Sequence, residues 1–262
     1  MYTLKSTCLA IMATTLVPLL TQAHPFHPES FLAGRGPQQQ LLRRTIAGIS
    51  VVDTPIVRAA QQFARDNSDD GLYGHVMRSW IFGAAMLSHN ATLRNLIDEE
   101  VHAVAALLHD LGLDQRPNSP IVSADKRFEV DGAIAARDFI RAHRDGRRWD
   151  EVRVQRVWDA IALHAELKIA PFKEIDVATV SRSVRLDFSE PEEGITQEEH
   201  DRVLKEFPNV NPKERVKQGM SWLCRLKPDS TYDNWVQGYG ERLVEGYSPK
   251  GHRIVDGVLG PE

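Results

Sequence analysis

The feature that most constrains the fold is a segment near the middle of the chain that is apolar on almost every side. It runs from Val101 to Leu111 and reads Val-His-Ala-Val-Ala-Ala-Leu-Leu-His-Asp-Leu. A helix that is hydrophobic all round is a buried helix, so we expect this one at the centre of the core. The segment nevertheless ends in the pair His109-Asp110, and burying an imidazole and a carboxylate without partners is costly. Because both groups suit divalent transition metals, the pair indicates either a metal site or a buried His–Asp hydrogen bond that only orders the core.

Three further polar residues fall at positions where the helical pattern predicts an inward side chain. His75 stands near the start of an expected helix, while His164 and Asp187 each continue an apolar stripe at helical spacing. The stripes are Val154, Val157 and Ile161 before His164, and Val177, Val180 and Val184 before Asp187. Any one of these residues alone is more simply a hydrogen-bonded core residue or a helix end. Together with the His-Asp pair, on separate helices, they indicate a functional site.

This pattern resembles that of the HD-domain superfamily of helical metalloenzymes, which has a His on one helix, a His-Asp pair on another and an Asp on a later one. The matching positions are His75, His109, Asp110 and Asp187. The resemblance spans roughly residues 50–235 and implies that these four residues are metal ligands. It also implies a single all-α helical domain with the metal site between core helices. The expected cofactor is a divalent metal ion, zinc or iron.

Within the superfamily the chain looks most like the fungal cyanamide hydratase group. The segments that carry this likeness are 75–78, 108–112, 127–133 and 186–187. The chain departs from that group at Leu113, where a threonine is usual, and at Ala133 and Glu190, where glycines are expected. Leu113 also differs from the lysine that phosphodiesterase-type HD domains often carry there. These departures concern the substrate rather than the metal site.

The resemblance implies a metal-dependent lyase or hydrolase that activates water for addition to a small nitrile-like substrate. Two His and two Asp ligands would leave coordination positions for water, as in catalytic rather than structural sites. We expect His164 to act as a base, a substrate contact or an extra ligand, and Glu129 to orient water. One alternative is a phosphohydrolase acting on a nucleotide or other phosphomonoester, for which Arg78 would supply a cationic contact. A second alternative is a non-catalytic protein whose metal site only stabilises the fold.

The first residues have the pattern of a secretory signal peptide. Lys5 supplies the positive charge, residues 9–20 form the apolar core, and Thr21-Gln22-Ala23 is a small-residue cleavage context. Cleavage after Ala23 predicts a secreted protein without membrane contact, whose only remaining thiol is Cys224. The expected organisation is a signal peptide (1–23), an N-terminal extension (24–50), an HD-type domain (51–235) and a C-terminal tail (236–262).

Helical periodicity continues through most of the chain after the N-terminal extension. We expect helices at 56–65, 126–143, 150–167, 175–187, 196–206 and 212–226, and we find no alternation typical of a sheet. The net charge of −4, from 32 Lys and Arg against 36 Asp and Glu, does not favour a nucleic-acid partner. The sequence therefore predicts one all-α domain that acts on a small molecule, and it leaves the oligomeric state open.

Overall fold

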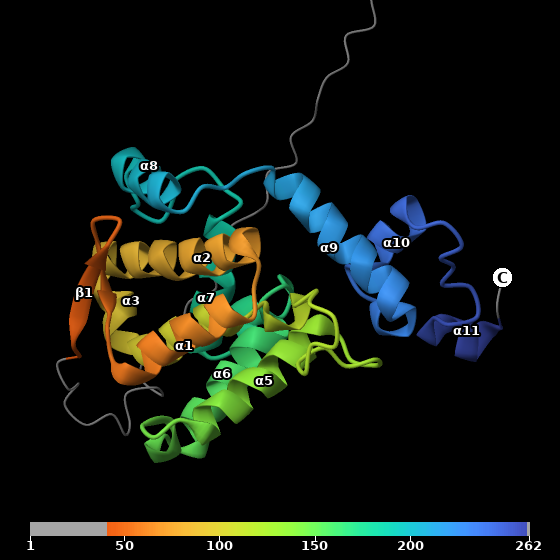
Figure 1. Ribbon diagram of the computed structural model, residues 1–262, viewed down its shortest axis with the longest axis horizontal. Helices are drawn as coiled ribbons and strands as arrows, with labels where there is room; N and C mark the ends of the chain where they lie inside the picture. Colours follow the sequence, from red (N-terminus) through yellow and green to blue (C-terminus); the bar gives the residue numbers. More distant parts are fainter. Residues whose placement is uncertain (1–40, 261–262) are drawn as a thin grey trace, which may run out of the picture. The chain divides into compact units, whose positions relative to one another are not determined.

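Helices form almost all of the regular structure in residues 41–260, the part of the chain that the computed structural model describes (Figure 1). The helices are α1 (Pro55–Asp66), α2 (Asp70–His89), α3 (Ala91–Leu96), α4 (Glu99–Leu108), α5 (Phe128–Ala142), α6 (Glu151–Leu163), α7 (Ile175–Leu186), α8 (Gln197–Glu206), α9 (Pro212–Leu226), α10 (Gln237–Leu243) and α11 (Ile254–Leu259). The two strands are β1 (Arg43–Ile46) and β2 (Ile49–Val52). The predicted all-α fold is confirmed.

The expected signal peptide, residues 1–23, lies outside the described residues, as do residues 24–40 of the expected extension. Among the helices within residues 41–260, none combines the length and the apolar character that crossing a membrane requires.

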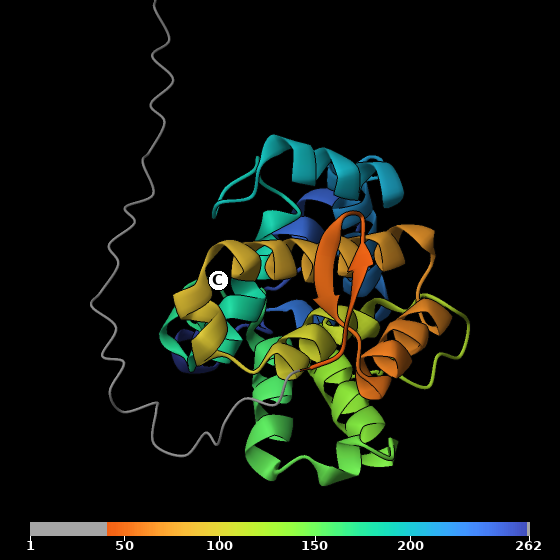
Figure 2. The ribbon, with the colours of Figure 1, turned by 90° about the vertical axis from the view of Figure 1, so that its left-hand side faces the viewer.

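Helix α4 lies at the centre of the core, as its sequence predicts. The Asp98 carboxylate caps its first turn by accepting hydrogen bonds from the backbone N–H groups of Glu100 and Val101. Every residue from Val101 to Leu108 is buried. Helices α1, α2, α5, α6 and α7 all pack against α4, and Figure 2 shows them gathered around it.

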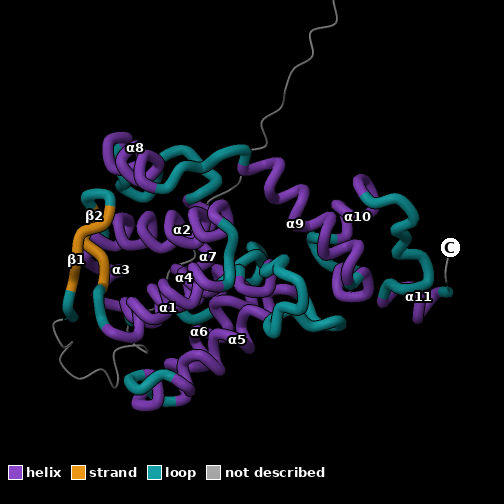
Figure 3. Tube along the Cα trace, viewed as in Figure 1, coloured by secondary structure: helices purple, strands orange, loops and turns teal. Residues whose placement is uncertain are grey.

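A short β-hairpin, which the residue pattern did not predict, covers one side of the core (Figure 3). Strands β1 and β2 are antiparallel, with Ile46 opposite Ile49. The two turn residues, Ala47 and Gly48, have φ angles of 49° and 79°, as a two-residue hairpin turn requires. The buried side chains of β2 pack against α2 and α4.

The C-terminal helices form a second, smaller apolar cluster. Met220, Leu223 and Cys224 of α9 pack with Val236 and with Phe128 at the start of α5. A fully buried ion pair of 2.6 Å between Lys227 and Asp131 ties the end of α9 to α5. The expected tail at residues 236–262 contains α10 and α11, and α11 keeps apolar side chains at the surface.

Candidate metal centre

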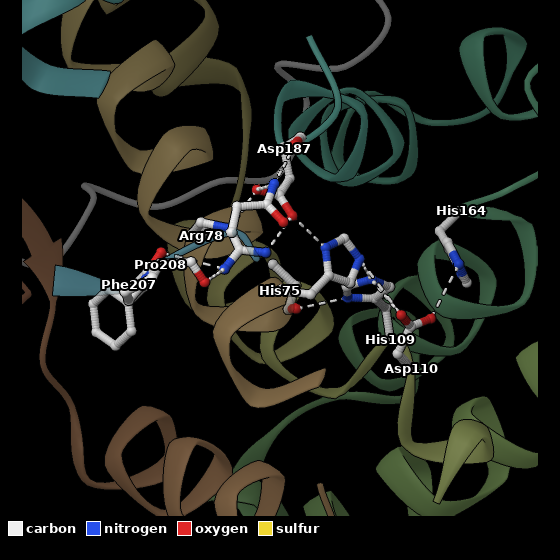
Figure 4. A network of polar contacts seen from close by, with 10 residues as sticks. His75, Arg78, His109, Asp110, His164, Asp187, Phe207 and Pro208 are labelled. Carbon is white, nitrogen blue, oxygen red and sulfur yellow. Dashed lines mark hydrogen bonds and ion pairs between the residues drawn. The ribbon is translucent and has the colours of Figure 1, made fainter. Parts of the chain in front are cut away.

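Three helices end at one point, and each presents a polar side chain there (Figure 4). His109, His164 and Asp187 are the C-cap residues of α4, α6 and α7. His75 comes from the second turn of α2, and Asp110 follows His109. A helix C-terminus carries partial negative charge from its unpaired carbonyl groups. Because three helix C-termini meet here, their combined partial charge favours the binding of a cation at this point.

His75, His109 and Asp110 place three ligand atoms at the corners of a small triangle. The two imidazole Nε2 atoms are 3.0 Å apart, and each is 3.4 Å from Asp110 Oδ2. Ligand atoms held 2.0–2.1 Å from a zinc ion at tetrahedral angles are about 3.3 Å apart. Of the described residues, these three form the group that could hold a metal ion, and their spacing fits one.

The protonation of the two imidazoles also calls for a cation between them. His109 Nδ1 donates to the carbonyl oxygen of Ala106 at 2.8 Å, and His75 Nδ1 donates to Asp187 Oδ2 at 2.7 Å. Carbonyl and carboxylate oxygens only accept hydrogen bonds, so in the neutral rings the protons are on Nδ1. Two unprotonated Nε2 atoms then face each other at 3.0 Å. A bound cation would replace the repulsion of their lone pairs by attraction.

The electrostatics of the cluster favour the ligand forms of His109 and Asp110. Burial lowers the pKa of His109 to about 3, so this imidazole is neutral at ordinary pH. For Asp110, burial opposes ionisation, but the neighbouring imidazoles of His109, His75 and His164 outweigh it and hold the pKa below its usual value. Neutral imidazole and ionised carboxylate are the forms that bind metal ions.

Asp187 was predicted as a fourth metal ligand, but the structure places it behind His75. Its Oδ2 accepts the Nδ1 hydrogen bond from His75, and both of its oxygens pair with the guanidinium group of Arg78, at 2.5 and 2.9 Å. Burial raises the pKa of Asp187, but the hydrogen bonds from His75 and Arg78 outweigh burial and lower it overall. A carboxylate behind a metal-binding histidine usually orients that ligand, and the role of Asp187 as a fourth ligand stays a prediction.

Arg78 was predicted as a phosphate contact, and its donors are already in use. Besides its pairing with Asp187, its remaining nitrogen donates to the carbonyl oxygens of Phe207 and Pro208, at 3.3 and 3.1 Å. The residue is 3% exposed. Its buried charge is therefore balanced within the protein and is not free for a substrate.

His164 approaches the cluster from the far side of Asp110, with its Nε2 atom 3.5 Å from Asp110 Oδ1. Its Nδ1 donates to the carbonyl oxygen of Ile161, three residues earlier in the chain. His109 makes the same contact with Ala106 at the end of α4. Both rings therefore turn Nε2 toward the centre. The structure brings His164 to the site as predicted.

Glu129 was predicted to orient water, and the structure places it behind Trp235, a residue that lines the cavity next to the cluster. The residue is 1% exposed. Its Oε1 accepts hydrogen bonds from Trp235 Nε1 at 3.1 Å and from Arg127 at 2.6 Å. Glu129 therefore fixes the position of Trp235, and it does not line the cavity next to the cluster.

A cavity of about 380 Å³ opens onto His75, Asp110 and His164. Most of its walls are apolar: Leu72, Leu113, Phe128, Leu167, Val184, Phe188, Pro212, Val216, Met220 and Trp235. The amino-acid pattern did not predict the wall that α9 and Trp235 provide. The only signal there is an ordinary amphipathic helix pattern, which does not distinguish a cavity from a packed core.

A comparison with protein-family models matches residues 72–206 to the HD domain. This segment is just over half of the chain and contains the residues of the cluster and those that contact it: His75, Arg78, His109, Asp110, His164 and Asp187. The chain belongs to the HD-domain family. HD domains are generally metal-dependent hydrolases that bind divalent metals, in agreement with the geometry of the cluster. A search of curated proteins finds no similar sequence, so the likeness to cyanamide hydratases stays a prediction.

Proposed function

We propose that this HD-domain protein is a metal-dependent enzyme that adds water to an uncharged, unsaturated group such as a nitrile. His75, His109 and Asp110 would hold the ion, and zinc and iron suit this set of nitrogen and oxygen atoms. When bound, such an ion polarises water and makes it a nucleophile near neutral pH. In the overall addition, the oxygen of water bonds to the nitrile carbon, and both protons of water end on nitrogen.

The observation that carries this proposal is that the described residues lining the cavity include no side-chain cation without a carboxylate partner. The three guanidinium groups in that lining each pair with a carboxylate: Arg78 with Asp187, Arg185 with Glu192 and Arg215 with Asp69. The lining contains no lysine. A phosphate monoester carries a charge of about −1.5 to −2 at pH 7 and needs free cationic contacts. A neutral substrate does not.

His164 is the residue best placed to move protons. It lines the cavity, whereas His109 is fully buried. Its Nδ1–H donates a hydrogen bond to the carbonyl oxygen of Ile161. The Nε2 atom would therefore be the one that takes a proton from water and returns it to the substrate nitrogen. Behind the cluster, Asp187 and Arg78 keep the ring of His75 in place. The apolar walls limit the access of bulk water.

The test compares two reactions of the metal-loaded protein. We expect urea to form from cyanamide, and no phosphate to be released from nucleoside monophosphates or p-nitrophenyl phosphate. His164→Gln should lose most of the urea formation while it keeps its metal. Glu99→Ala, which changes a partly buried residue paired with Arg43 at the start of α4, should retain it.

The other outcomes distinguish the alternatives. Release of phosphate by the wild type and loss of this release in Asp110→Ala would establish the phosphohydrolase instead. Absence of both reactions, together with a lower melting temperature in Asp110→Ala, would favour a structural metal site.

A further inference from the structure

The cavity is larger than a nitrile group requires. Its volume of about 380 Å³ lies in the range of sites that bind drug-sized ligands. Cyanamide, with three heavy atoms, would occupy only the part next to the cluster. The rest of the space is lined mainly by apolar side chains.

One face of α9 supplies a wall of the cavity that lies beyond the HD-domain match, which ends at residue 206. The lining residues of α9 are Pro212, Arg215, Val216, Gly219 and Met220, which recur at the spacing of three and four that places side chains on one helix face. Leu223 and Cys224 on the same helix pack into the second apolar cluster. The packing of Leu223 and Cys224 in this cluster therefore fixes the position of α9 beside the cavity.

Gly219 leaves open space in this wall. The residue is buried, yet a Cβ atom added there would meet no heavy atom within 4 Å. Gly112 behaves in the opposite way, because a Cβ there would come within 2.0 Å of the carbonyl oxygen of Phe128. Close packing requires Gly112, whereas Gly219 widens the cavity.

An aromatic surface connects the cluster to the α9 side. The ring of Phe128 meets His164 edge-on at 5.8 Å and Trp235 edge-on at 6.2 Å between centroids. Phe128 also packs in one cluster with Met220 and Val216. A substrate whose reacting group lies at His164 would thus extend along Phe128 toward α9.

We propose that the substrate carries an uncharged, apolar body attached to the group that takes up water, and that Val216, Gly219 and Met220 of α9 bind this body. The identity of the reacting group rests on the proposed function above. Binding of the body rests only on the shape and chemistry of the cavity, so the two can be tested separately.

The experiment fills the cavity at Gly219 and compares the result with a matched change elsewhere. Gly219→Leu would project a side chain into the cavity. Gly238→Leu in α10 is the control, because a Cβ at Gly238 also meets nothing within 4 Å but this residue does not line the cavity. The readouts are the affinity for prodan, a neutral naphthalene fluorophore, and the kcat/KM for phenylcyanamide against cyanamide.

We expect the wild type to bind prodan and to prefer phenylcyanamide at least tenfold. Gly219→Leu should weaken prodan binding at least tenfold and remove the preference, while Gly238→Leu changes neither. Metal content should be equal in all three proteins. Gly219→Ala should act in the same direction with a smaller effect, which covers the case of a poorly folded leucine variant.

Three outcomes would overturn the inference: equal prodan binding by the Gly219 and Gly238 variants, a wild type that binds no prodan, or a wild type that prefers cyanamide. If neither nitrile is hydrated but prodan binding still depends on Gly219, the proposed reaction fails and the apolar binding site stands.

Discussion

His109 and His164 are oriented by the same local device although they belong to different helices. Each is the residue that ends its helix, and each donates Nδ1 to the carbonyl oxygen three residues earlier. That hydrogen bond fixes the tautomer and turns Nε2 toward the cluster. A histidine directly after an apolar stripe is thus positioned by its own helix, which is why the sequence could locate both.

Periodicity predicted the direction of the Asp187 side chain but not its hydrogen-bond partners. Its spacing from Val177, Val180 and Val184 correctly placed the side chain inward, and these residues are buried. The spacing of residues along a helix predicts only the direction in which a side chain points. Whether a carboxylate reaches a metal or stops behind another ligand depends on its partner, and that partner is Arg78 on α2.

Replacing the two aspartates should separate direct from indirect support of the metal. Asp110→Ala removes a ligand oxygen, and we expect loss of stoichiometric metal. Asp187→Asn leaves the ligand triangle in place and removes the charge behind His75, so we expect metal affinity to fall about 10–100-fold. Competition with a chromophoric chelator measures both. Equal loss in the two variants would make Asp187 a direct ligand.

His102 should make the metal-free protein sensitive to acid. The side chain is buried in α4 with its Nε2 atom 2.9 Å from Ser183 Oγ, and burial lowers its pKa to about 4. The unfolded state, with an ordinary pKa of about 6.5, therefore binds more protons below that pH. Stability from this group is present above pH 6.5 and is lost as the pH falls toward 4.

The expected loss from His102 is about 3 kcal/mol between pH 7 and pH 4. Urea unfolding of chelator-treated protein across this range measures it, with His102→Gln as the comparison. The variant should be less stable at pH 7 and should show a shallower decline. A decline as steep as that of the wild type would rule out His102 as its source.

At the scale of elements, the hairpin shows why a pattern of residues can miss a real structure. Two-residue hairpin turns favour Asn-Gly or Asp-Gly, and this chain has Ala47-Gly48. The positive φ of Ala47 is unfavourable for a residue with a side chain. Helix α8 supports the turn, because Glu206 accepts a hydrogen bond from the backbone N–H of Ala47 at 2.9 Å. This tertiary contact has no local signal in the sequence.

Most of the longer helices lie where they were predicted, whereas the short helices α3, α10 and α11 were not predicted and one helix end was placed wrongly. The helix expected at 150–167 ends at Leu163. The chain turns at His164, whose carbonyl oxygen accepts a hydrogen bond from Ser181 of α7. The turn brings His164 to the cluster. The apolar stripe predicted which face is buried, but the end of the helix depends on a neighbouring helix.

The buried pair of Lys227 and Asp131 should be the main polar attachment of α9 to the domain. Lys227→Met removes the ion pair and leaves the Asp131 carboxylate buried, where it accepts a hydrogen bond from the backbone N–H of Ser123 at 3.0 Å. We expect a loss of about 3–5 kcal/mol in unfolding free energy. Lys213→Met, at an exposed position of α9, is the control. Similar denaturant midpoints for the two variants would mean that the pair adds no stability.

At the scale of the whole molecule, the metal should contribute to stability. Three helix ends and the second turn of α2 meet at the cluster, so an ion there joins elements far apart in the sequence. The purified protein should carry about one divalent ion per chain. An ion present at about 1,000 times its dissociation constant adds about 4 kcal/mol. A chelator should therefore lower the melting temperature and added zinc should restore it. Metal-free protein with an unchanged melting temperature would contradict this.

The last prediction concerns export. Lys5, the apolar stretch at 9–20 and the Thr21-Gln22-Ala23 context predict removal of the first 23 residues. Removal takes Cys8 with it and leaves Cys224, a buried free thiol whose pKa is raised by burial. We therefore expect mature protein recovered outside the cell to begin at His24, and a reductant to leave its melting temperature unchanged. Mass spectrometry of protein from its native host tests this. A chain that begins at Met1 inside the cell would refute export without affecting the metal centre, because every ligand lies beyond residue 74.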